Sequence, residues 1–199
     1  MEENTVRFLD NFSAGTRGAI STEHFLNHNY AVVFLHRTHS IQPFTRQYSH
    51  SMNPFLDLLE PCSAKHASIK DTPCIRVKSA SAQSMSTVLE KYSQIMSSGR
   101  LLILNFQTVY DYLHALKLCC LRLSPVFQSS LVIYLAAAVS DFYIPQSRLS
   151  QHKIQSTGDG LVLALDPVPK MLGVIVNTWT YPHHPFIISF KVYPLSSLW

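Results

Sequence analysis

Short apolar runs, spaced along the chain, constrain the fold more than any other feature of the sequence. Continuous apolar segments at residues 30–36, 101–105 and 131–138 predict strands that are buried on both faces, as in parallel sheets. Between them, apolar residues recur at helical spacing over residues 17–27 and 83–97, which predicts amphipathic helices. Because strands and helices alternate, the sequence predicts an α/β fold with a Rossmann-like, doubly wound, mostly parallel sheet and helices on both faces.

The second half of the chain continues this alternation. Thr108 and Asp111 have the spacing of a capping box, with Asp in place of the usual Glu or Gln, and they predict the start of a further helix. Residues 161–165 and 186–190 are apolar enough to predict two more strands, and residues 170–178 between them predict a helix.

Residues 38–82 interrupt the alternation, because they show no clear period of two or of 3.6. Pro, Ser, His and Thr are frequent there, so we expect a long irregular insertion with one short helix near residues 55–59. Loops of that length inside a compact domain are usually functional. The total length of 199 residues fits one α/β domain.

Charge and hydropathy limit the partners that we expect. The net charge of +4 comes from scattered basic residues and forms no stripe, so we expect no nucleic-acid partner. The longest apolar run, residues 131–139, is far shorter than the roughly 20 residues of a membrane span. The first residues are acidic and polar, and the four cysteines form no CxxC pair, so we expect a cytoplasmic protein with reduced thiols and no membrane association.

Residues 11–18 form a turn of small residues before the first predicted helix. Gly15 and Gly18 would let backbone N–H groups approach a phosphate, and the helix N-terminus would add partial positive charge. The spacing is neither GxGxxG nor a Walker A loop. The alternative reading is an ordinary strand-to-helix turn.

Two later segments also carry side chains that suit a ligand. Ala136, Ala137 and Ala138 end a buried strand and leave room beside the backbone, and Asp141 follows them. The alternative is that the alanines allow close helix packing and the Asp caps the next element. Lys153 lies in a loop that suits a triphosphate, or else is simply solvated.

His24 and His28 have the spacing of metal ligands, but no third ligand is indicated, so we expect no protein metal site.

Three segments together resemble phosphopantothenate–cysteine ligase, also called phosphopantothenoylcysteine synthetase. They are Arg7-Phe-Leu-Asp-Asn-Phe-Ser-Ala-Gly-Thr-Arg-Gly18, Tyr134-Leu-Ala-Ala-Ala-Val-Ser-Asp-Phe-Tyr143 and His152-Lys-Ile-Gln-Ser156. The chain is similar to the stand-alone eukaryotic type, from about residue 6 to residue 191. The length and order of the first two motifs make chance agreement improbable.

The resemblance implies roles for particular residues. Those that would contact the nucleotide are Ser13, Gly15, Gly18, Lys153 and Phe190, with Phe190 at the base and Lys153 at the phosphates. Those that would hold 4′-phosphopantothenate are Arg7, Asn11, Ala137, Ala138 and Asp141, with Arg7 reaching across a dimer interface. Asn11 and Lys153 would be the catalytic residues.

The resemblance also implies a reaction. ATP or CTP, with Mg²⁺, would convert the carboxylate of 4′-phosphopantothenate to an acyl-nucleotidylate, which the amine of cysteine would attack within a homodimer. This chemistry belongs to coenzyme A biosynthesis and needs no side-chain nucleophile, in agreement with the lack of a Ser-His or Cys-His signature.

The resemblance fails at both ends of the chain. Family members have a strand and a Gly-Gly-Thr turn ahead of the Arg7 motif, and residues 192–199 diverge from the family pattern. We therefore expect residues 1–199 to form a single nucleotide-binding ligase domain that is incomplete at both ends. An inactive or weakly active form that keeps dimerisation or phosphopantothenate binding is the alternative. A third reading is an NADP-dependent oxidoreductase, with Arg37 placed to contact a 2′-phosphate.

Overall fold

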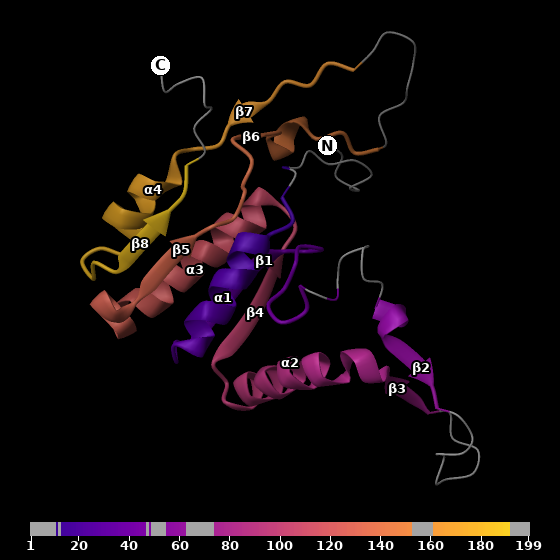
Figure 1. The fold of residues 1–199 in the computed structure, drawn as a ribbon. Coiled ribbons are helices and arrows are strands. Elements are labelled where there is room, and N and C mark those ends of the chain that lie inside the picture. Colours follow the sequence, from indigo (N-terminus) through magenta and orange to yellow (C-terminus); the bar gives the residue numbers. More distant parts are fainter. Residues whose placement is uncertain are drawn as a thin grey trace, which may run out of the picture. The chain divides into compact units, whose positions relative to one another are not determined.

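The computed structural model describes residues 11, 13–46, 48, 55–62, 74–152 and 161–191 (Figure 1). The chain divides into two compact units. We call Ala14–Asn105 the inserted unit, and Met1–Ser13 together with Phe106–Trp199 the flanking unit. The expectation of one domain over residues 1–199 stays a prediction, and each unit is described by itself.

The inserted unit is built around one helix and a pair of strands. Helix α1 (Thr16–Asn27) contacts strand β1 (Val32–Arg37), which pairs with β4 (Leu101–Phe106). Helix α1 buries Ala19, Thr22 and Leu26, at positions i, i+3 and i+7 of one face. The unit's core consists of the buried side chains Ala19, Leu26, Phe34, Phe44, Ile95 and Leu101. Ile95 comes from helix α2 (Ser79–Ser97).

The expected irregular insertion is partly ordered, which corrects the prediction for residues 38–82. A 3₁₀ helix, η1 (Phe55–Leu58), lies where a short helix was predicted. Strands β2 (Leu59–Pro61) and β3 (Ile75–Val77) then pair antiparallel, and α2 begins at Ser79. A disulfide joins Cys62 to Cys74 at the end of this strand pair, so the expectation of four thiols is wrong. The spacing of the cysteines could not show this, because the pairing of β2 with β3 brings them together.

The flanking unit combines a long helix with a parallel strand pair. Helix α3 (Val109–Phe127) begins with the predicted capping box: the Asp111 N–H donates to Thr108 Oγ1, and the Thr108 N–H donates to the Asp111 carboxylate. Strands β5 (Val132–Leu135) and β8 (Phe186–Ser189) are parallel, with Val132 opposite Phe186. Figure 1 shows the two strands side by side. A 3₁₀ turn, η3 (Gln128–Ser130), links α3 to β5.

The helical segment before β8 packs on α3. Helix α4 (Met171–Val174) continues into a π-helical turn, η5 (Ile175–Trp179), so the helix predicted over residues 170–178 is present. Its contact with α3 helps to form the unit's core, which consists of Tyr112, Leu116, Cys120, Ile133, Ile175 and Trp179.

The strand predicted at residues 161–165 is wrong. Those residues have no regular structure, and the short strand β7 (Asp166–Pro167) follows them and pairs antiparallel with β6 (Phe142–Tyr143). Val162 is 95% exposed, so the apolar run is not buried. A 3₁₀ turn, η4 (Gln146–Arg148), follows β6. Apolar composition predicts a strand only where a neighbouring strand is available to pair with it.

The α/β class is therefore confirmed, and the parallel pair β5–β8 agrees with it. The described strands form four two-stranded sheets, so the full doubly wound sheet stays a prediction. Among the described helices, none is both long enough and apolar enough to cross a lipid bilayer.

Candidate functional site

The glycine turn lies at the N-terminus of α1, in the inserted unit. Gly15 is the N-cap residue and has φ 81° and ψ 10°, a left-handed conformation that favours glycine. Its carbonyl accepts a hydrogen bond from the Ala19 N–H at 3.1 Å, which starts the helix. Gly18 lies in the first turn of α1, where an added Cβ would stand 3.6 Å from Cε2 of Phe34. The backbone at Gly15 thus has the shape that the sequence predicts for a turn before a helix.

The segment after β1 contacts this turn closely. The Ile41 N–H donates to the Ala14 carbonyl at 2.8 Å. A Cβ added at Gly15 would stand 3.1 Å from Cβ of Ser40, so Ser40 fills the space that the glycine leaves. Nδ1 of His36, on β1, lies 3.2 Å from Oγ of the same serine. Sequence analysis assigned no role to His36 or Ser40.

His36 is unusual because it is a buried polar residue in an apolar strand. Its side chain is 7% exposed, and its ring stacks on Phe34 with centroids 5.3 Å apart and planes 9° from parallel. Burial lowers the pKa of His36 below its ordinary value, because the charged ring would lose its hydration. The imidazole is therefore neutral at physiological pH and can either donate to the Ser40 hydroxyl or accept from it.

A second cluster of predicted residues lies in the flanking unit, at the carboxyl end of β5. Nδ2 of Asn11 donates a hydrogen bond of 3.4 Å to the Ala138 carbonyl, although the two residues are 127 positions apart in the sequence. Ala137 and Ala138 are exposed, so the backbone beside them is open to a ligand. The Ser13 N–H donates to the Asn11 carbonyl at 2.8 Å, which turns the chain at this point.

Asp141 is held by the chain that follows the alanines. Its carbonyl accepts from the Val168 N–H at 2.8 Å, which extends the pairing of β6 with β7, and its side chain is exposed. The Ser140 hydroxyl donates to the Phe142 carbonyl at 2.7 Å. An ion pair between Arg148 and Asp166 also links η4 to β7. The predicted carboxylate thus stands on a fixed backbone with its oxygens available to a ligand.

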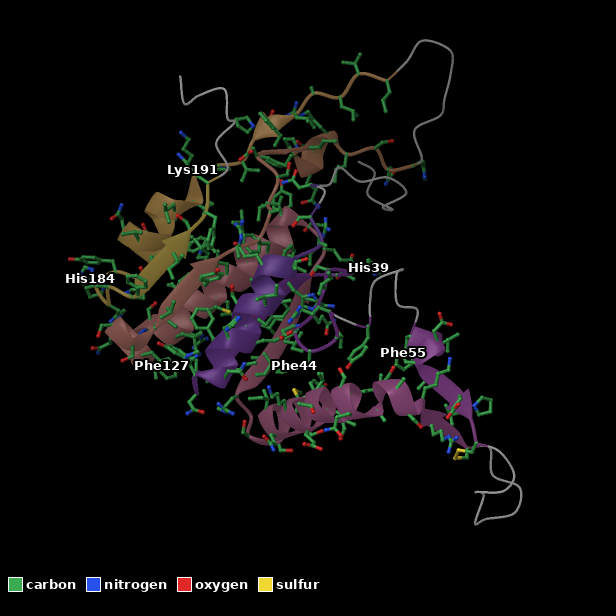
Figure 2. All side chains as sticks on the ribbon, in the orientation of Figure 1. His39, Phe44, Phe55, Phe127, His184 and Lys191 are labelled. Carbon is green, nitrogen blue, oxygen red and sulfur yellow. A yellow bond between two sulfur atoms is a disulfide. The ribbon has the colours of Figure 1, made fainter. Side chains whose placement is uncertain are left out.

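Phe190, the residue predicted to contact the nucleotide base, follows β8. Its ring meets the ring of Tyr134 on β5 edge to face, with centroids 5.1 Å apart, and its side chain is 42% exposed. Lys191 follows it and is labelled in Figure 2. Because β5 and β8 are parallel, Phe190 and the alanine segment leave the same edge of the strand pair.

The structure brings some of the predicted residues together and leaves others outside its description. Asn11 and Ala138 are in contact, and Ala137 and Asp141 lie on the same segment as Ala138. Gly15 and Gly18 belong to the other unit. Arg7 and Lys153 lie outside the described residues.

No protein metal site is found among the described side chains, where no three His, Cys, Asp or Glu residues gather. Nδ1 of His28, the C-cap residue of α1, lies 2.8 Å from the carbonyl oxygen of His24.

Comparison with known proteins finds several relatives of the chain. It is 41% identical to phosphopantothenate–cysteine ligase CAB2 of Saccharomyces cerevisiae over 96% of this chain and 54% of that protein. It is 40% identical to phosphopantothenate–cysteine ligase of Mus musculus over 96% of this chain and 59% of that protein. The predicted resemblance to phosphopantothenate–cysteine ligases is confirmed. No protein-family model matches the chain.

Solved structures agree with the sequence relatives. A Cab2 mutant in complex with phosphopantothenate-cysteine has 43% sequence identity and a TM-score of 0.82, and the match covers 98% of this chain and 61% of that one. The fold of the chain is therefore that of the corresponding part of Cab2. The chain spans a little more than half the length of the curated relatives that it matches.

Proposed function

We propose that the chain carries ligand-binding parts of a phosphopantothenate–cysteine ligase, which joins 4′-phosphopantothenate to cysteine in coenzyme A biosynthesis. The observation that carries the proposal is the Asn11–Ala138 hydrogen bond, which joins two motifs that the resemblance assigns to the same ligand. The relatives at about 40% identity bear the name of this ligase, and Cab2 has been solved with phosphopantothenate-cysteine. Both observations support the same substrate.

In this proposal the flanking unit holds the acyl substrate. The open backbone at Ala137 and Ala138 receives the pantothenate chain, and Asp141 accepts hydrogen bonds from its hydroxyl or amide groups. Asn11 keeps one N–H in its bond to Ala138, and its second N–H donates to the acyl oxygen. Donors aimed at an oxygen that gains negative charge stabilise the transition state, and this is the catalytic role that we assign to Asn11.

The nucleotide supplies the activation that a carboxylate lacks. ATP or CTP, accompanied by Mg²⁺, forms the acyl-nucleotidylate and releases pyrophosphate, and the cysteine amine then displaces the nucleoside monophosphate. Gly15 and Gly18 offer a backbone without side chains to the phosphates, with Ser13 before them, and Phe190 offers its partly exposed ring to the base. We also assign Lys153 to the phosphates, and Arg7 to the partner subunit's substrate in a cytoplasmic homodimer.

A pyrophosphate assay tests the proposal. The purified chain is incubated with Mg²⁺, 4′-phosphopantothenate and either ATP or CTP, with and without cysteine. We expect pyrophosphate release without cysteine and amide product with it. Asn11→Asp should lower turnover at least tenfold, because one donor of this kind contributes on the order of 10²-fold or more. Asn177→Asp, an exposed position in the same unit, is the matched control.

A second candidate is a non-enzymatic form that binds phosphopantothenate without turnover. It is favoured by one observation: the described residues assigned to phosphopantothenate all lie in the flanking unit, whereas the glycine turn assigned to the nucleotide belongs to the inserted unit. Saturable binding of phosphopantothenate with no pyrophosphate release would select this candidate. If neither phosphopantothenate nor ATP bound while NADPH did, both candidates would be wrong.

A further inference from the structure

The glycine turn contacts Ser40, whose hydroxyl lies 3.2 Å from Nδ1 of His36, a buried histidine to which the proposed reaction assigns no role. His36 is the penultimate residue of β1, and Ser40 lies three residues after the end of that strand, beside Gly15. We propose that they are positioning residues for the nucleotide, which hold the Ala14–Gly15 backbone in the conformation that receives the phosphates. This inference rests on the proposed function, because it assumes that the nucleotide binds at this turn.

The first step concerns Ser40 and Ile41, which contact the turn directly. The Ile41 N–H donates to the Ala14 carbonyl at 2.8 Å, so this carbonyl is already held by the segment after β1. Ser40 Cβ and Oγ lie 3.1 and 3.3 Å from the position of an added Cβ at Gly15, so the serine closes that side of the glycine. These contacts restrict a residue that, as glycine, has the widest choice of backbone conformations.

The second step concerns what holds Ser40. Its N–H donates to the Arg37 carbonyl at 2.9 Å, which forms the tight turn after β1. Its hydroxyl lies 3.2 Å from Nδ1 of His36, the penultimate residue of β1, and this strand is hydrogen-bonded to β4. Support therefore runs from the strand pair through His36 and Ser40 to Gly15.

The third step concerns the choice of histidine. A buried polar ring in an apolar strand costs free energy unless a hydrogen bond offsets it. His36 is 7% exposed, and its stacking partner Phe34 is the residue that an added Cβ at Gly18 would touch at 3.6 Å. One aromatic pair on β1 thus faces both glycines of the turn, Gly18 through Phe34 and Gly15 through His36 and Ser40.

Two substitutions of His36 separate the hydrogen bond from simple burial. His36→Asn keeps a polar atom near the position of Nδ1, whereas His36→Gln places its amide near the position of Nε2. Both are neutral and smaller than histidine. Ser40→Ala removes the hydroxyl at a partly exposed position and should fold normally. Thermal melts of all variants show which of them remain folded.

Binding of ATP with Mg²⁺ to the full chain is measured by calorimetry, with 4′-phosphopantothenate as the control ligand. We expect Ser40→Ala and His36→Gln to weaken ATP binding about three- to tenfold, the range of one lost hydrogen bond. His36→Asn should stay within about twofold of the parent. The double variant Ser40→Ala with His36→Gln should be no weaker than either single variant, because both remove the same bond. Phosphopantothenate binding should not change.

The outcomes that overturn the inference differ from those that overturn the proposed function. If the unchanged chain binds no ATP or CTP, the proposed nucleotide function fails and the inference falls with it. If the unchanged chain binds ATP and Ser40→Ala binds it equally well, only the inference is wrong. Equal loss of ATP and phosphopantothenate binding would show a merely structural role and would also overturn it.

Discussion

Replacing glycine by alanine at two positions of the same turn should change stability in opposite directions. At Gly15, alanine must adopt φ 81°, which costs about 1–2 kcal/mol for a residue with a Cβ. Its Cβ would also stand 3.1 Å from Cβ of Ser40, whose backbone is held on both sides by hydrogen bonds. Overpacking of this kind costs about 1–3 kcal/mol.

The expected total for Gly15→Ala is therefore about 2–5 kcal/mol, a large share of the 5–15 kcal/mol that stabilises a typical domain. In a chain of this size, such a loss lowers the Tm by about 4–20 °C. Gly18→Ala should instead leave the Tm unchanged or raise it slightly. Its Cβ meets Phe34 at an ordinary 3.6 Å, and alanine favours a helix over glycine by about 0.5–1 kcal/mol.

A third glycine separates the two causes. Gly99 has φ 66° with nothing within 4 Å of an added Cβ, so Gly99→Ala measures the conformational cost alone. The difference between Gly15→Ala and Gly99→Ala then measures the contact with Ser40. Differential scanning calorimetry and urea titration give both values. The reasoning would be refuted if Gly15→Ala melted at the parent temperature, or if it lost no more stability than Gly99→Ala.

Three further outcomes are expected. Thr108→Ala should lower the free energy of unfolding by about 0.5–2 kcal/mol while Thr108→Ser does not, as urea titration would show, because the hydroxyl caps α3. His36 has a folded-state pKa below its ordinary 6.5, so the unfolded chain binds more protons below that pH. Stability should thus be full above about pH 6.5 and fall as the pH drops below it; urea midpoints that fell equally steeply in His36→Asn would contradict this. Burial raises the pKa of Cys120 to about 11, so mass spectrometry should find it unmodified by iodoacetamide at pH 7.5 until guanidinium unfolds the chain.

Local patterns could be predicted from the sequence because their causes are local. The capping box of Thr108 and Asp111 needs only a spacing of three residues, and the structure contains it. The buried face of α1 likewise follows from helical periodicity. In contrast, the apolar run at residues 161–165 is not a strand, because pairing depends on a neighbour that the run itself does not specify.

Features that join distant parts of the chain needed more than the sequence pattern. The disulfide of Cys62 and Cys74 depends on the pairing of β2 with β3, which no periodicity indicates. The contact of Asn11 with Ala138 was expected only through the resemblance, since spacing alone cannot bring residues 127 positions apart together. His36 looked like one more member of an apolar strand, and only its distance to Ser40 reveals a different role.

The division into two units has a consequence for synthesis on the ribosome. The inserted unit is continuous in the sequence, so it can complete its own contacts as soon as residue 105 has left the exit tunnel. Asn11 is translated before that unit, but its partner Ala138 emerges long after it. The segment that bears Asn11 must therefore remain without its partner Ala138 while the whole inserted unit folds. We expect that nascent chains stalled when residue 105 has left the exit tunnel, but Ala138 has not, protect the β1–β4 pair from proteolysis while Asn11 remains open to it.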